Sequence, residues 1–172
     1  MSRARRNHNK RRRESFPRKI PASALALDKL FDYNPVLEDF KATPTSLYGW
    51  FWGKVPSVNK LTLDIHKTHR RASTAEVRRF KRGLKEILAG KQDSVPASRF
   101  YKLVIWVAKP CYTAGGQVEK WDVSNYLKVA EDGLTEALGF DDSRIARIEG
   151  VKVQTTGRAA WAFELTVTEN PQ

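Results

Sequence analysis

Cysteine is nearly absent from this chain of 172 residues, which contains only Cys111. One cysteine cannot form an internal disulfide, and it cannot supply the ligand set of a zinc finger. The sequence also lacks any apolar run near the roughly 18 residues that a membrane-spanning helix requires. No apolar stretch follows the basic N-terminus, so we expect no secretory signal. These absences exclude disulfide-stapled and membrane-spanning proteins, and they favour a protein of the reducing cytoplasm.

Acidic residues are scarce as well, since 19 Asp and Glu stand against 31 Lys and Arg, for a formal net charge of +12. The excess lies in two blocks: residues 1–20 hold nine basic residues and one acid, and residues 60–91 hold ten basic residues and three acids. Each Lys or Arg that neutralises a phosphate releases a condensed counterion, so this segregation favours a nucleic-acid partner. The alternative for the first block is a solvated arm that only aids solubility.

The distribution of apolar residues divides the chain into three parts. We expect a disordered basic arm in residues 1–21, and a short helix and linker in residues 22–45. Residues 46–169 are expected to form the globular domain. Its order of strand, helix, strand, helix, strand, strand is typical of an α+β fold, in which a mixed β-sheet packs with two main helices.

Four segments of this domain have the apolar patterns of strands. Residues 47–52 are aromatic and apolar, and residues 99–108 are almost continuously apolar, as in a strand buried on both faces. Residues 145–153 predict a strand with a bulge at Gly150. In residues 160–168 alternate positions are apolar, which predicts one buried and one exposed face.

Two segments have apolar residues at helical spacing. The first, residues 73–89, begins with a capping box at Ser73. The second, residues 123–138, follows Asp122, a suitable N-cap, and ends before Gly139.

The polar side of this second helix, with the residues that flank it, carries an unusual set of side chains. Asn125, Lys128 and Asp132 lie within roughly 60° of one another, because each helical residue advances about 100°. The pair Asp141-Asp142 follows the helix. Carboxylates repel phosphates, but they hold hard divalent cations such as Mg²⁺, which activate water and stabilise charge on phosphoryl oxygens. The set therefore suggests metal-dependent chemistry on a phosphodiester.

Each of these residues also has an ordinary structural interpretation. Asp122 alone is most often an N-cap, and Lys128 with Asp132 is a common surface pair at i, i+4. Asp141-Asp142 is compatible with a solvated loop. The joint spacing, rather than any single residue, favours the functional interpretation.

Three runs carry a resemblance to a known family: Asp122-Val-Ser-Asn125-Tyr-Leu-Lys128, Glu131-Asp132-Gly-Leu and Gly139-Phe-Asp141-Asp142-Ser-Arg-Ile145. They resemble the RusA-type Holliday-junction resolvases, small endonucleases common in phages and prophages. The upstream run Val55-Pro56-Ser57-Val58-Asn59-Lys60 resembles an early segment of the same family, and is less specific. The resemblance covers residues 47–167 and excludes the basic arm.

The resemblance implies a homodimer in the bacterial or phage-infected cytoplasm. It implies binding to four-way DNA junctions and two opposed nicks, made with Mg²⁺ or Mn²⁺ held by aspartates. By position, Asp122 is the first metal ligand, Asp142 is the late one, and Lys128 is the lysine needed for catalysis. Asp141 and Asp132 are supporting acids, and Asn125 follows the ligand loop.

The sequence departs from the family at Ser124, where well-known members have a second aspartate. A hydroxyl or a water at Ser124 would replace that carboxylate, so metal affinity would fall or the ligand set would depend on Asp141 or Asp132. Two alternatives stay open: a non-catalytic basic nucleic-acid-binding protein, and a metal-dependent nuclease that acts on flaps or RNA. The residues expected to contact DNA are Asn59, Lys60, Lys67, Arg70, Arg71, Arg78, Arg79, Arg82, Arg11, Arg12 and Arg13.

The length of the second helix raises a geometric problem. Its 16 residues span about 24 Å, which puts Asp122 and Asp142 near opposite ends. Either Gly133 kinks the helix, or two copies pack antiparallel about a two-fold axis, so that Asp142 of one copy meets Asp122 of the other.

Overall fold

The structure is a computed structural model that describes residues 33–58, 62–65 and 70–169. The expected basic arm in residues 1–21 and most of the expected short helix and linker, up to residue 32, lie outside these ranges. Within the described ranges, no helix is both long and apolar enough to cross a membrane.

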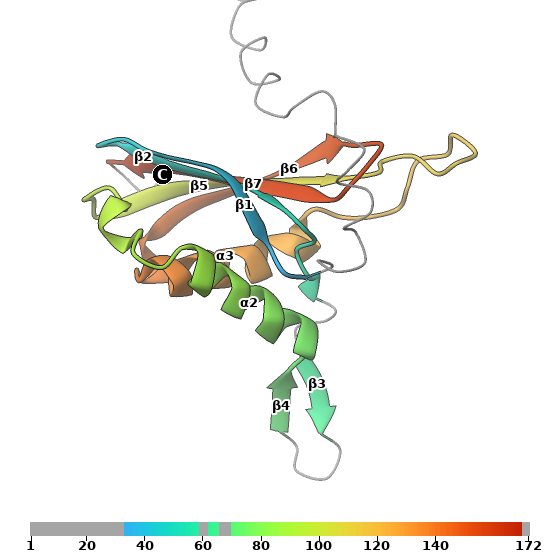
Figure 1. Cartoon of the computed structure of the whole chain (residues 1–172), viewed down its shortest axis with the longest axis horizontal. Helices are drawn as coiled ribbons and strands as arrows, with labels where there is room; N and C mark the ends of the chain where they lie inside the picture. Colours follow the sequence, from blue (N-terminus) through green and yellow to red (C-terminus); the bar gives the residue numbers. More distant parts are fainter. Residues whose placement is uncertain (1–32, 59–61, 66–69, 170–172) are drawn as a thin grey trace, which may run out of the picture.

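A five-stranded mixed sheet forms the centre of the fold (Figure 1). Only β5 and β6 are parallel neighbours, and the other neighbouring pairs are antiparallel. Strand β5 lies inside the sheet, between β7 and β6, which confirms the strand expected from its apolar run. The strand order is β1 (Val36–Ala42), β2 (Ser46–Trp52), β7 (Ala160–Thr168), β5 (Phe100–Lys109) and β6 (Ile145–Gln154).

Two helices, α2 (Ala75–Ile87) and α3 (Ser124–Leu138), lie on one face of the sheet (Figure 1). The class expected from the sequence, α+β with a mixed sheet and two main helices, is confirmed. A separate two-stranded sheet, β3 (Thr62–Ile65) and β4 (Arg70–Ser73), leads into α2 and projects from the body of the domain (Figure 1). The described residues also include the short 3₁₀ turns η3 (Gln92–Ser94) and η4 (Asp142–Arg144).

The linker predicted for residues 22–45 is wrong where β1 lies. This strand pairs with β2 along its length, with a bulge between Leu37 and Asp39. The bulge brings Leu37 and Phe40 to the same side, where both pack on the core. Their spacing of three positions breaks the two-residue period of a strand, so the pattern did not indicate one. The domain therefore includes residues before Ser46.

Three local predictions also need correction. Helix α2 is capped by Thr74, whose side chain accepts a hydrogen bond from the N–H of Val77, and not by Ser73. The N-cap position of α3 is Val123, not Asp122. The bulge in β6 lies at its start, where Tyr101 pairs with Ile145 and Lys102 with Arg147, and not at Gly150. Gly139, in contrast, ends α3 with a φ of 73°, as expected.

Gly150 and Gly133 allow close packing of α3. A Cβ at Gly150 would lie 3.0 Å from Cδ2 of Leu127, so the bare backbone lets the first turns of α3 approach β6. A Cβ at Gly133 would lie 2.9 Å from Cδ1 of Leu84 on α2. Helix α3 runs continuously through Gly133, so this glycine serves the contact between the helices.

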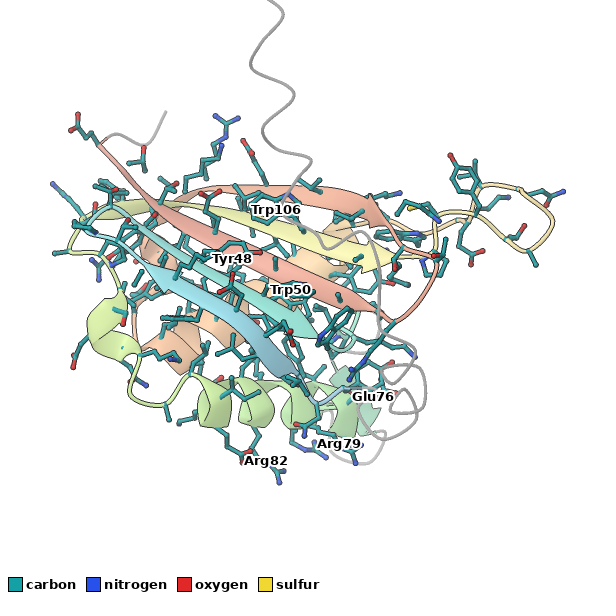
Figure 2. The ribbon with its side chains drawn as sticks, turned by 45° about the horizontal axis from the view of Figure 1, so that its top comes forward. Tyr48, Trp50, Glu76, Arg79, Arg82 and Trp106 are labelled. Atoms are coloured by element: carbon teal, nitrogen blue, oxygen red, sulfur yellow. The ribbon has the colours of Figure 1, made fainter. Side chains whose placement is uncertain are left out.

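The sheet face away from the helices carries a second apolar cluster, which includes Trp50, Trp52 and Ala162. Figure 2 shows Tyr48, Trp50 and Trp106 on this side. Ala160 and Ala162 are therefore buried, and the exposed face predicted for residues 160–168 is wrong for the first half of β7. The small alanine side chains lie among tryptophans that cover them.

Candidate active site along helix α3

Lys128 lies at the centre of a cluster of carboxylates on α3. Its Nζ is 2.9 Å from Oδ1 of Asp132, 3.3 Å from Oε2 of Glu131 and 3.3 Å from Oδ2 of Asp142. The hydrogen bond to Asp132, with the charges of Glu131 and Asp132 and a hydrogen bond to Asp142, raises the pKa of Lys128 above its usual range. Lys128 is therefore a permanent cation whose ammonium group is held in place. The structure thus brings together Lys128, Asp132 and Asp142, three residues that the sequence singled out.

The turn after α3 places Asp142 beside this cluster. Gly139 adopts the left-handed conformation that ends the helix, and the carboxylate of Asp141 then accepts a hydrogen bond of 2.8 Å from the N–H of Ser143. Arg144 anchors the same turn, because it donates to the hydroxyl of the buried Tyr101 at 2.8 Å. Asp142 is fixed between these two anchors.

Asp141 and Asp142 differ in their roles within the turn. The hydrogen bonds from the side chain and the backbone N–H of Ser143, with the charge of Arg144, lower the pKa of Asp141. Its carboxylate caps η4, as a structural acid does. Asp142 has a half-exposed side chain whose described partner is Lys128.

Asp122 lies just before α3 and is exposed to solvent. Its Oδ1 accepts a hydrogen bond of 3.0 Å from the N–H of Ser124, which is the first residue of the helix. Hydrogen bonds from the backbone and the side chain of Ser124, with the charge of Lys152, lower the pKa of Asp122. The carboxylate is thus ionised over the neutral range and open to a cation. Ser124 is exposed beside it, and Asn125 is half-buried.

The predicted separation of Asp122 and Asp142 needs revision. Asp142 does not lie beyond the end of α3, because its contact with Lys128 places it beside the middle of the helix, near Glu131. At about 1.5 Å per residue, Glu131 still lies about 13 Å along the helix from Asp122. Within the part of the chain that the structure describes, no three His, Cys, Asp or Glu side chains group to hold a metal ion.

An aromatic and basic cluster lies next to Asp122. The rings of Trp121 and Tyr126 meet edge to face, with centroids 5.8 Å apart. Nζ of Lys109 lies 5.3 Å from the centroid of Trp121, and Nζ of Lys152 lies 4.8 Å from it. Lys152 also donates to the carbonyl oxygen of Trp121.

The two lysines of this cluster were not among the residues predicted from the sequence. Lys109 ends β5, and Lys152 lies toward the end of β6. Because β5 and β6 are parallel, their carboxyl ends meet at one edge of the sheet, and the start of α3 lies there too. Both lysines lie near the ends of predicted strands, but only the parallel pairing of these strands brings the two together.

The residues expected to contact DNA are described only in part. Arg78, Arg79 and Arg82 are exposed on α2, and Figure 2 shows Arg79 and Arg82 on the side of the helix away from the sheet. Arg70 and Arg71 lie on the strand β4 that leads into this helix. The remaining predicted contacts lie outside the described residues: Asn59, Lys60, Lys67, Arg11, Arg12 and Arg13.

No protein-family model matches the chain, and no curated protein matches it.

Proposed function

We propose that this protein is a structure-specific endonuclease of the RusA type, which resolves four-way DNA junctions by Mg²⁺-dependent phosphodiester hydrolysis in the cytoplasm. The observation that carries the proposal is the contact between Lys128 and Asp142. These residues come from two separate runs of the resemblance, and the fold joins them on one surface. A cation held among acids on the same helix that begins after the exposed carboxylate of Asp122 is an arrangement suited to phosphoryl chemistry.

The donor chemistry of the acids fits a hard divalent cation. Asp122 and Asp142 offer exposed carboxylate oxygens, the ligands that Mg²⁺ and Mn²⁺ prefer, and Asp132 and Asp141 lie beside Asp142 as supporting acids. When bound, the ion would lower the pKa of a water and polarise the scissile phosphate. Lys128 would neutralise charge on the phosphate or on the leaving oxygen.

The proposal includes a homodimer with shared sites. Asp122 and Asp142 lie too far apart along one helix to hold the same ion directly, as the helical rise indicates. Two copies related by a two-fold axis would bring Asp122 of one copy to Asp142 of the other. Two equivalent sites also suit a junction, in which two opposed strands are cut.

DNA would be held mainly through its backbone. The exposed arginines of α2 present positive charge that follows phosphates and does not read base edges. Such contacts favour recognition of the shape of a branched DNA over its sequence. We therefore expect junction binding that weakens steeply with salt.

A nicking assay on a synthetic four-way junction tests the proposal. Wild-type protein should nick with Mg²⁺ and not with EDTA, and Asp122→Asn should lose nicking while it keeps junction affinity. Asp93→Asn, which removes an exposed acid on η3, is the matched control and should nick like wild type. Absence of nicking with Mg²⁺ and with Mn²⁺ contradicts the proposal. Parallel assays on a flap and on a structured RNA identify a nuclease with a different substrate.

One observation favours a second candidate, a junction-binding protein that does not cut. Ser124 stands exposed where the resemblance expects a second aspartate. Such a protein would bind the junction with the same salt dependence and would nick in no metal. The nicking assay separates the two candidates.

A further inference from the structure

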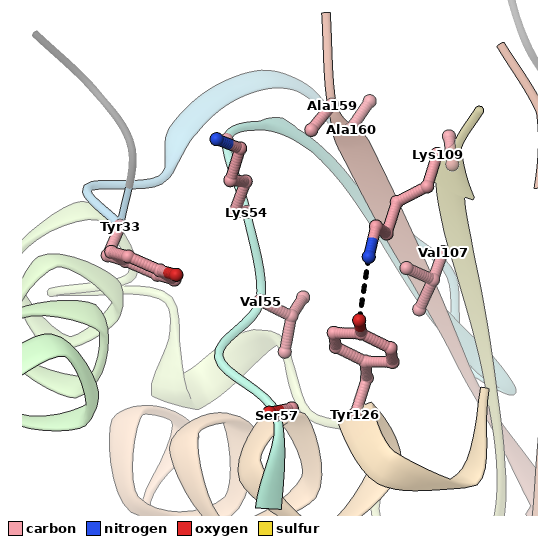
Figure 3. A pocket seen from close by; sticks show the side chains of 11 residues that line it. Tyr33, Lys54, Val55, Ser57, Val107, Lys109, Tyr126, Ala159 and Ala160 are labelled. Atoms are coloured by element: carbon pink, nitrogen blue, oxygen red, sulfur yellow. Dashed lines mark hydrogen bonds between the residues drawn. The ribbon is translucent and has the colours of Figure 1, made fainter. Parts of the chain in front are cut away.

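A cavity of about 250 Å³ lies between the segment after β2, the end of β5 and the start of α3 (Figure 3). We propose that it is a pocket for one nucleotide phosphate, on a nucleic-acid strand that crosses the start of α3. The pocket deepens the proposed function and rests on it for the identity of that strand. The cavity is separate from the acidic cluster on α3, because none of the residues that pair with Lys128 lines it.

The lining of the cavity selects an anion. It contains two lysines, Lys54 and Lys109, and the hydroxyls of Tyr33, Ser57 and Tyr126, while most of the remaining wall is valine and alanine. Among the described residues that line it, none is acidic. Ammonium groups and hydroxyls around an apolar wall form charge-assisted hydrogen bonds to a phosphate. The volume lies below the 300–1,000 Å³ typical of drug-sized ligands, so one phosphate with its sugar fits better than a larger molecule.

Lys109 gives the strongest indication that the cavity binds an anion. Its Nζ donates a hydrogen bond of 2.7 Å to the hydroxyl of Tyr126 and lies 4.9 Å from the centroid of that ring (Figure 3). The side chain is half-buried, and it forms no ion pair with any described residue. Burial of an ammonium group without a counterion is unfavourable. An anion in the adjoining cavity would complete the set of partners around Lys109.

The pocket also has a defined place relative to Asp122. Lys109, which lines the cavity, lies over the ring of Trp121. Lys152 lies over the same ring, and its charge acts on Asp122. Positive charge therefore runs from the cavity, past the ring of Trp121, to the exposed carboxylate. A strand held by its phosphate in the cavity would continue along these positive charges toward Asp122.

Binding of a short probe in EDTA tests the pocket without any cleavage. The probe is a thymidine dinucleotide with a 5′-phosphate, compared with the same dinucleotide with a 5′-hydroxyl, and binding is followed by amide shifts of the full chain. We expect the phosphorylated probe to bind about tenfold tighter and to shift Ser57, Lys109 and Tyr126. Lys109→Met and Lys54→Met should each remove most of that preference. The control Lys41→Met, which removes an exposed charge on β1, should change it less than twofold.

Two results overturn the pocket. One is equal binding of the two probes, and the other is an equal loss in Lys41→Met and Lys109→Met, which would indicate diffuse charge. Lys54 is exposed, so its variant tests the pocket even where Lys109→Met fails to fold. Failure of the proposed function looks different, because nicking would then be absent while the phosphate preference and the shifts persist.

Discussion

Nζ of Lys128 lies 3.3 Å from Oδ2 of Asp142, although a helix end and a tight turn separate the two residues along the chain. The contact requires the chain to fold back after Gly139, and the hydrogen bonds of Asp141 and Arg144 hold it in that course. Lys128 therefore has two effects. It compensates three acids that would otherwise repel one another, and it places a fixed positive charge where the late aspartate is exposed.

Lys128→Met should separate these effects. We expect nicking of a four-way junction to fall about 100-fold, as happens when a preorganised charge at a reaction centre is lost. The free energy of unfolding should fall by about 1–3 kcal/mol, because Glu131 and Asp132 are only 16% and 23% exposed and would lose their cation. Rates and thermal melts compared with Lys41→Met check both values. Nicking at the wild-type rate would show that Lys128 is only structural.

Ser124→Asp should restore the carboxylate that the resemblance expects at this position. Two acids two positions apart at the start of α3 would bind Mg²⁺ more tightly, so the Mg²⁺ concentration for half-maximal nicking should fall about tenfold. Thr45→Asp is the control, since it adds an acid to the exposed turn between β1 and β2. If Ser124→Asp leaves the metal dependence of nicking unchanged, Asp122 does not ligate the ion.

The pKa of Asp122 predicts how stability depends on pH. Hydrogen bonds from Ser124 lower this pKa in the folded chain, so the ionised carboxylate contributes stability above the ordinary Asp value of 3.8. That contribution is lost as the pH falls through the lower, folded-state pKa. Ser124→Ala removes the side-chain donor, so the carboxyl signal of Asp122 should titrate at a higher pH than in wild type. Carbon-detected NMR titration measures this, and an unchanged midpoint would contradict the role of the Ser124 hydroxyl.

Gly150→Ala should disturb the position of Asp122 more than it disturbs the fold. The new Cβ would meet Leu127 at 3.0 Å and Val123 at 3.2 Å, which pushes the first turn of α3 away from β6. We expect a loss of about 1 kcal/mol in the free energy of unfolding and a clear loss of nicking. Gly115→Ala, in a loop with space around it, should alter neither quantity. Full nicking by Gly150→Ala would show that α3 tolerates the shift.

The sequence predicted those parts of the fold whose signal is local. The apolar run of β5 and the helical spacing of α3 were sufficient for both elements, because each segment carries its own pattern. Strand β1 was missed since the bulge between Leu37 and Asp39 breaks its alternation. Composition suggested a bulge at Gly150 in β6, whereas this glycine makes room for Leu127 of helix α3, which packs against the sheet. Gly150 is therefore needed for the packing of α3 against β6, which no local pattern predicts.

The residues of the candidate site also fall into two groups: those that the sequence predicts and those that depend on the fold. Asp122, Lys128 and Asp142 could be proposed from spacing and resemblance, because they lie in one continuous stretch of sequence. Lys109 and Lys152 meet Trp121 only through the parallel pairing of β5 and β6, which no local pattern predicts. Contacts of this kind, which depend on which strands pair, can be predicted only after the strand order is known.

Mixing two inactive variants tests whether sites are shared between copies. If Asp122 of one copy works with Asp142 of the other, a heterodimer of Asp122→Asn and Asp142→Asn contains one intact site and one doubly altered site. Random exchange makes half of the dimers mixed, so about a quarter of wild-type nicking should return. If each site lies within one chain, every site in the mixture lacks one aspartate, and no activity returns. A single-chain fusion of the two variants makes every molecule a heterodimer without subunit exchange. If this fusion does not nick, the sites are not shared between copies.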